Sequence, residues 1–270
     1  MAAVVLSVFA WGSAVADPLG TDGEDVPATA GELRFLEMVV KRVEASLPVP
    51  AGWKREAEVV VSGYPVLEGE PVRIFYRAWK GPLRIHLLFW FSKITETERK
   101  QAAARKNAEE LQQEMIAAAM RGDTARVEEL QQQLGALVRS QVLEGPMGQA
   151  AGAAPSRPTE SPSRFSVNVV VNGQGQTIGK KYEVAVPGVL KAFRVAGGKE
   201  GQAYRTYYLG RWDVSSRQSN WKVQAFRGDY VPANHLKVMT ISLELAGEEA
   251  VVDRYARDLL DLGGIRSLLD

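Results

Sequence analysis

Apolar residues recur every three or four positions between residues 33 and 47, which predicts an amphipathic helix. Thr29 and Glu32 stand just before this stretch at the spacing of a capping box, so the helix should begin there, and Pro48 should end it. The expected core face consists of Leu33, Leu36, Val40, Val43 and Leu47. The first ordered element is therefore predicted to be a helix with one buried face.

Alternation with a period of two then replaces the helical period and predicts three strands. They are expected at residues 57–62, 72–79 and 83–91. Short connections that contain Gly and Pro favour antiparallel pairing of neighbouring strands. Alternate residues from Leu83 to Phe91 should face the core, and His86 lies on the second face. We interpret His86 as a surface residue or a hydrogen-bonded core residue rather than as a ligand.

The apolar period changes again in residues 93–143, where two narrow seams flank the tetrapeptide Arg121-Gly122-Asp123-Thr124. Gly122 suits the end of one helix, and Asp123 or Thr124 can cap the next. The seams are Ala104, Ala108, Leu111, Met115 and Ala118, then Val127, Leu130, Leu134 and Leu137. We predict a long helical hairpin, an antiparallel coiled coil whose first arm of about 27 residues is roughly 40 Å long.

Residues 144–163 are rich in Gly, Ala, Pro and Ser and lack large apolar side chains, so they are interpreted as a linker. Beyond the linker, strands are expected at residues 165–171, 182–186, 192–195, 203–209, 222–226 and 236–245, with a helix at residues 248–260. This second half, residues 164–270, is therefore predicted to be β-rich with a C-terminal helix.

Together these elements predict an α+β fold, with antiparallel sheets, flanking amphipathic helices and the long inserted helical hairpin. An antiparallel hairpin returns the chain close to the place where it left. We therefore expect residues 29–92 and 164–270 to form one body that carries the hairpin of residues 93–143 as an insertion.

The N-terminal segment points to export. Residues 1–16 are small or apolar and end in Ala14-Val15-Ala16, a pattern that signal peptidase accepts, although Lys and Arg are absent from the first positions. Residues 17–28 are interpreted as a flexible leader. We predict a signal peptide, export to a bacterial periplasm and no transmembrane span after cleavage.

The amino-acid composition excludes several kinds of functional site. The 270 residues include two His and no Cys, which excludes disulfides and thiolate ligands and leaves little imidazole for a metal site or a catalytic triad. We predict no metal and no cofactor. The weak catalytic candidates are His235, with Asp213 or Asp229 to orient it, but no nucleophile-elbow pattern accompanies them. A binding protein is favoured over an enzyme.

Charge is uneven along the chain. Residues 164–246 hold 12 basic and 5 acidic residues and 10 of the 22 aromatic residues. Basic and aromatic groups together can bind an anionic or sugar-like ligand. The candidate ligand-binding residues are Arg205, Arg211, Trp212, Arg217, Trp221 and Lys222. The alternative is a half-buried sheet with aromatic residues inside and basic residues outside.

Three functional hypotheses follow. The first is an exported, non-catalytic binding or envelope-associated protein that takes an anionic envelope ligand through the basic-aromatic residues. The second is an envelope-acting hydrolase with acid and base residues in the second half. The third is an oligomeric scaffold in which the hairpin binds a protein partner. The overall charge of +1 and the predicted export argue against nucleic acid.

Overall fold

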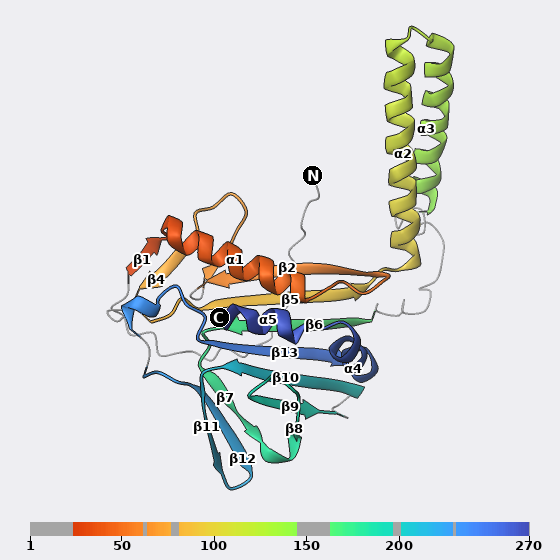
Figure 1. Cartoon of the computed structure of the whole chain (residues 1–270). Helices are drawn as coiled ribbons and strands as arrows, with labels where there is room; N and C mark the ends of the chain where they lie inside the picture. Colours follow the sequence, from red (N-terminus) through yellow and green to blue (C-terminus); the bar gives the residue numbers. More distant parts are fainter. Residues whose placement is uncertain are drawn as a thin grey trace.

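An eight-stranded antiparallel sheet forms the centre of the protein (Figure 1), with the strand order β3-β2-β5-β6-β13-β10-β9-β8. The computed structural model describes residues 24–61, 64–76, 81–144, 163–196, 201–228 and 231–269. The strands are β2 (Trp53–Val61), β3 (Tyr64–Pro65), β5 (Ile85–Lys93), β6 (Arg164–Val171), β8 (Glu183–Val184), β9 (Lys191–Val195), β10 (Gln202–Gly210) and β13 (Thr240–Glu248). The coarse prediction of a mixed α and β chain with antiparallel sheets is confirmed.

Strands β5 and β6 pair directly, although residues 94–163 separate them in the sequence. Leu87 lies opposite Val169, and Phe89 lies opposite Val167. All four side chains are almost fully buried, so this pairing also joins the apolar residues of the two β-rich halves. Both halves therefore contribute strands to one sheet and side chains to one core.

Three helices, α1 (Ala30–Ser46), α4 (Glu249–Asp258) and α5 (Leu262–Arg266), cover one face of this sheet (Figure 1). Four aromatic rings meet beneath them. Phe91 and Phe165 stack with their centroids 4.5 Å apart, and Tyr255 and Trp53 contact Phe165 at 4.8 and 5.3 Å. Burial of apolar and aromatic surface is the largest favourable term in folding, so this cluster anchors α4 to the sheet.

Helix α1 begins at the predicted capping box, and its buried face agrees with the prediction in part. The Thr29 side chain accepts from the Glu32 backbone, and the Glu32 side chain accepts from the Thr29 backbone. Of the predicted core face, Leu36, Val43 and Leu47 are buried as expected, but Leu33 is 42% exposed, and Phe35 and Val39 are buried in addition. Glu32 is also buried, and Nε2 of His235 lies 2.7 Å from its Oε1.

The second of the three predicted strands does not lie between its neighbours. β4 (Arg73–Tyr76) pairs with β1 (Glu24–Pro27) in a separate two-stranded sheet, and β2 pairs with β5. Residues 24–27, assigned to the flexible leader, therefore form a strand. Residues 1–23 lie outside the described residues, as does most of the predicted linker.

A three-stranded sheet packs beside the β8–β10 end of the large sheet (Figure 1). Its strands are β7 (Gly175–Gly179), β11 (Trp212–Arg217) and β12 (Asn220–Ala225). Trp212 contacts Tyr208 edge to face at 5.1 Å, and Tyr208 contacts Phe193 at 6.0 Å. These rings form a second, smaller core. The remaining short elements are the 3-10 helices η2 (Lys180–Tyr182), η4 (Pro232–Asn234) and η5 (Ser267–Leu269).

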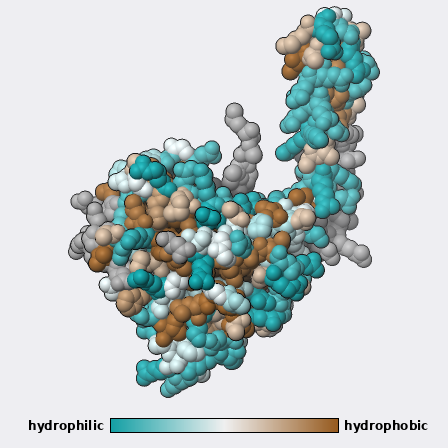
Figure 2. Space-filling view, viewed as in Figure 1, coloured by the Kyte–Doolittle hydropathy of each residue, from teal (hydrophilic) through white to brown (hydrophobic). Residues whose placement is uncertain are grey.

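Helices α2 (Glu96–Met120) and α3 (Thr124–Glu144) pack side by side and extend away from the sheets (Figures 1 and 2). We call them the α2–α3 arm. They meet at a turn in which Gly122 has a φ of +75°, a value that favours glycine. Thr95 and Glu98 form a second capping box at the base. No helix among the described residues has the length and apolarity needed to cross a bilayer.

Candidate functional site

The six basic and aromatic residues singled out in the sequence do not share one surface. Arg205 lies on the helix-covered side of β10, where its Nε and Nη2 are both 2.7 Å from Oδ1 of Asp253 in α4. Trp212 is 7% exposed and donates from Nε1 to the Leu209 carbonyl at 2.7 Å. Trp212 therefore belongs to the interior of the protein, and Arg205 to a partly exposed ion pair between β10 and α4.

The remaining four lie on or next to the small sheet. Arg217 and Lys222 are exposed on its outer face, and Arg211 is exposed at the bend between β10 and β11. Trp221 belongs to the inner face, with Nζ of Lys191 4.0 Å from its ring centroid. The arrangement matches the alternative of a sheet with aromatic residues inside and basic residues outside. Arg205 is excluded from any such surface because it lies across the large sheet.

The weak catalytic candidates are also separate. Nε2 of His235 lies 2.7 Å from Oε1 of Glu32, and Nδ1 lies 2.9 Å from the Gly81 carbonyl oxygen. Both neighbours carry hydrogen-bond acceptor oxygens. Asp213 lies on the outer face of β11, and Asp229 is outside the described residues. His235 therefore joins α1 to the chain before β5.

Glu32 is 2% exposed, and its charge is held by hydrogen bonds. Burial acts to raise the pKa of Glu32, but hydrogen bonds from Thr29 and His235 outweigh it and lower the pKa below its ordinary value of 4.5. The carboxylate accepts from the Thr29 backbone at 2.7 Å and from the Thr29 hydroxyl at 2.8 Å. The ionised form is therefore the one that stabilises the fold.

We predict that Glu32→Gln lowers the free energy of unfolding by about 1–3 kcal/mol at pH 7. Because the folded pKa is depressed, the stabilisation is complete above the unfolded value, near pH 4.5, and is lost as the pH falls through the folded value. Urea unfolding from pH 7 to pH 3 should therefore show the difference between wild type and variant shrinking below pH 4.5. Glu37→Gln, at an exposed pair with Lys41, is the control. A difference independent of pH would contradict the assignment.

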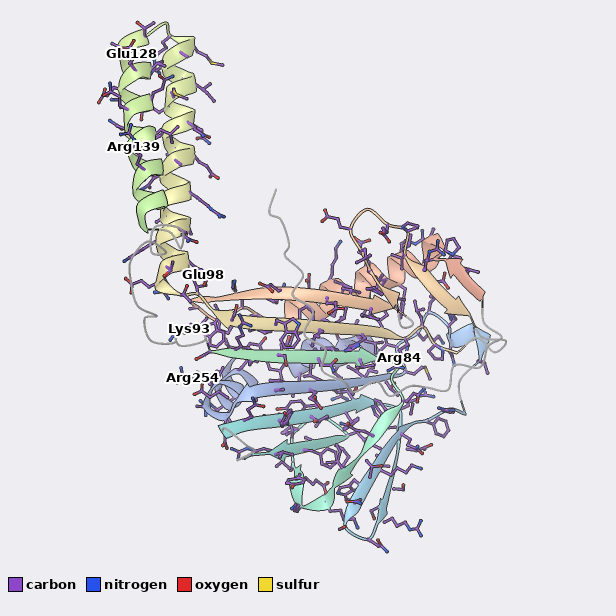
Figure 3. The ribbon with its side chains drawn as sticks, turned by 180° about the vertical axis from the view of Figure 1, so that it is seen from behind. Arg84, Lys93, Glu98, Glu128, Arg139 and Arg254 are labelled. Atoms are coloured by element: carbon purple, nitrogen blue, oxygen red, sulfur yellow. The ribbon has the colours of Figure 1, made fainter. Side chains whose placement is uncertain are left out.

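On the face of the large sheet opposite α1, α4 and α5, the small sheet covers part of β9 and β10, where Phe193 and Tyr208 pack with Trp212. The rest of this face, here called the open face, carries an unusual polar row. Figure 3 views the molecule from behind, with the strands in front of those helices. The register places Asn168 opposite both Leu88 and Glu244, and Glu244 opposite Thr206. His86 lies two residues from Leu88 and on the same side of β5. Residues from four strands therefore meet at the middle of this face.

Two polar atoms in this row are buried without a hydrogen-bond partner among the described residues, Nε2 of His86 and Oδ1 of Asn168. Burial lowers the pKa of His86, and the Asn168 side chain partly opposes this. The side chain of Glu244 is half-buried and has no cationic partner in the described parts of the chain. Burial raises the pKa of Glu244. Unpaired buried polar groups cost about 1–3 kcal/mol each, so these two atoms lower the stability of the fold and lie just beneath this face.

Aromatic side chains border the polar row. Trp90, next along β5 on the open face, is 48% exposed. The register runs from Trp90 through Ser166 and Ala246 to Tyr204 on β10. At about 4.8 Å per strand, three spacings put the backbones of Trp90 and Tyr204 roughly 14 Å apart, with only short side chains between them. A ligand of a few rings would fit between these aromatic residues.

The two carboxylates in this row lie far apart. Glu58 is the carboxylate in the same row as Glu244, and three strand spacings separate them by roughly 14 Å. Pairs of carboxylates that hydrolyse glycosides lie about 5 to 9.5 Å apart. Within the described ranges, no group of three or more acidic or imidazole side chains is placed to hold a metal ion. The open face can instead offer hydrogen-bond acceptors, hydroxyls and an exposed indole ring.

Alternation in the third predicted strand placed His86 on a second face, but it did not reveal Asn168 and Glu244 beside it. Those residues follow 82 and 158 positions after His86, on strands whose order depends on long-range pairing. The only local signal was a polar residue at an alternate position within each apolar strand. No match to this chain was found among protein-family models, curated proteins or solved structures.

Proposed function

We propose that this protein is an exported, non-catalytic binding protein that holds a hydroxyl-rich ligand, such as an envelope glycan, on the open face of its large sheet. The observation that carries the proposal is the polar row of His86, Asn168 and Glu244 beside the exposed ring of Trp90. Ligand sites commonly combine apolar and aromatic surface with a few convergent polar groups. The open face has this composition.

The charges on the open face favour a neutral ligand over an anionic one. Its acidic groups are Glu56 and Glu58 on β2, Glu183 on β8 and Glu244 at the centre, and the register places the basic groups Lys54, Arg164 and Lys191 nearer its margins, so charges of both signs are mixed on this face. Lys191 is held by Glu183 and by the ring of Trp221. An anion at the centre would meet the Glu244 carboxylate, whereas a sugar hydroxyl can donate to that carboxylate.

The proposal also includes the export of the protein and its division into a body and an inserted hairpin. Residues 1–16 are the proposed signal peptide, and they lie outside the described residues. Residues 29–92 and 164–270 are proposed as one body, and residues 93–143 as an inserted antiparallel coiled coil. The pairing of β5 with β6 and the packing of α2 on α3 support this division.

Binding of the full mature chain to an array of bacterial envelope glycans tests the function. We expect Trp90→Ala and Glu244→Gln each to weaken binding at least tenfold, about 1.4 kcal/mol, because each removes a direct ligand contact. Lys222→Ala, on the outer face of the small sheet, is the matched control and should leave affinity unchanged. All three positions are at least partly exposed, so the fold should survive.

Two results would overturn the proposal. One is the absence of glycan binding by the wild-type protein. The other is salt-sensitive binding of anionic envelope material that Lys222→Ala and Arg217→Gln abolish, which would move the ligand to the basic outer face of the small sheet.

A further inference from the structure

We infer that two copies of this chain associate through their α2–α3 arms, lying antiparallel so that the tip of each arm is beside the base of the other. The first observation is that the two helices do not bury their own seam. Among its nine residues, only Ala118 and Leu130 are buried, while the other seven are partly exposed. When a pair of helices leaves aliphatic residues exposed to water, burying those residues against further helices stabilises the assembly.

The exposed seam opens into a groove halfway along the arm. Leu111, Ala136 and Leu137 line it, with Glu110, Glu114 and Gln133 also at its walls. Residues 107–114 lie near the middle of α2, and residues 133–137 lie near the middle of α3. A two-fold axis through this groove places groove against groove, the self-complementary contact that symmetric dimers use. Four helices would then enclose the exposed aliphatic residues.

The distribution of charge along the arm favours a second copy of the same arm as the partner and favours an antiparallel orientation. Residues 107–133, the distal half, carry six carboxylates and two arginines, a net charge of −4. Residues 96–106 and 134–144, the proximal half, carry five basic and three acidic residues, a net charge of +2. Figure 3 shows Glu128 toward the tip and Glu98 at the base. An antiparallel pair places the acidic half beside the basic half, whereas a parallel pair places the two acidic halves together.

Charged groups left over in a single arm agree with this pairing. Within the described residues, Arg99 and Arg105 near the base form no ion pair, nor do Glu109 and Glu128 farther along. The arm also stands clear of the body (Figures 1 and 2), so a second arm can approach it along its length. Figure 2 shows hydrophobic residues in patches along this otherwise hydrophilic arm.

Sedimentation velocity of the full mature chain tests association. We expect a dimer in 0.05 M NaCl that weakens as salt rises, because attraction between exposed charges is screened. The variant Arg99→Glu/Arg105→Glu should raise the dimer dissociation constant at least tenfold. Neither arginine forms an ion pair within the described residues, so the arm should stay folded, which helical circular dichroism checks. A monomer at all concentrations up to about 100 μM would overturn the inference.

Spin labels distinguish the two directions, and the absence of Cys from the chain makes each label unique. Met120 is 85% exposed at the tip, and Gln133 is exposed near the proposed axis. In an antiparallel dimer, labels on Met120→Cys should lie about 30 Å apart, since each is ten residues from the axis at 1.5 Å per residue. Labels on Gln133→Cys should lie within about 20 Å of each other, given helix spacings of 8–10 Å. Short distances at both positions would indicate a parallel pair and overturn the inference.

Discussion

Phe165→Ala should lower the free energy of unfolding by about 3–5 kcal/mol, the usual cost of removing a buried phenylalanine. Phe165 is 2% exposed and lies in β6, after the arm, but it stacks on Phe91 of β5, before the arm. It also contacts Trp53 and Tyr255, so its removal leaves a cavity among three other rings. Urea unfolding followed by tryptophan fluorescence measures the loss.

Ser166→Ala provides the control, because the next residue points to the open face and should change stability by less than about 0.5 kcal/mol. A loss below about 1 kcal/mol for Phe165→Ala would contradict the shared core. Two separate unfolding transitions, one for each β-rich half, would contradict it as well, since one body should unfold cooperatively.

Asn172→Ala should cost about 3 kcal/mol or more, because one side chain satisfies several buried backbone groups. The amide nitrogen donates to the Leu83 and Lys237 carbonyls at 2.9 Å. The amide oxygen accepts from the backbone of Met239 at 2.8 Å and of Thr240 at 3.4 Å. Asn172 thus ties the ends of β5, β6 and β13 together.

The backbone of Asn172 has a φ of 57°, which alanine adopts only with strain. Asn172→Gly removes the same hydrogen bonds without that strain, so it should be about 1 kcal/mol more stable than Asn172→Ala. Thermal or urea unfolding of both variants separates the two contributions. The assignment fails if both variants stay within about 0.5 kcal/mol of wild type.

Local features of the fold could be predicted because they depend on residues close together in the sequence. The capping box of Thr29 and Glu32 uses residues three apart, and the turn at Gly122 needs only a glycine with a positive φ. The burial of Glu32 could not be predicted, because its partner His235 follows it by 203 positions. A contact at that separation leaves no mark in the local pattern.

The same distinction explains the candidate site. A count of basic and aromatic residues between 164 and 246 grouped Arg205 with Lys222, because they are close in sequence. Strand pairing then placed Arg205 against Asp253 and Lys222 on another sheet. Asn168 and Glu244 were overlooked because only the pairing of β6 with β13 brings them together. When a site is formed by side chains on adjacent strands, its residues are set by the pairing register of those strands, which the local sequence pattern does not reveal.

Nuclear magnetic resonance of the isotopically labelled protein tests most directly whether the open face holds the ligand. Titration with the glycan that binds best should shift the indole N–H of Trp90, the side-chain amide of Asn168 and backbone signals of β5, β6 and β13. Shifts confined to Arg217, Lys222 and their neighbours on β11 and β12 would contradict the account, because they would place the ligand on the outer face of the small sheet.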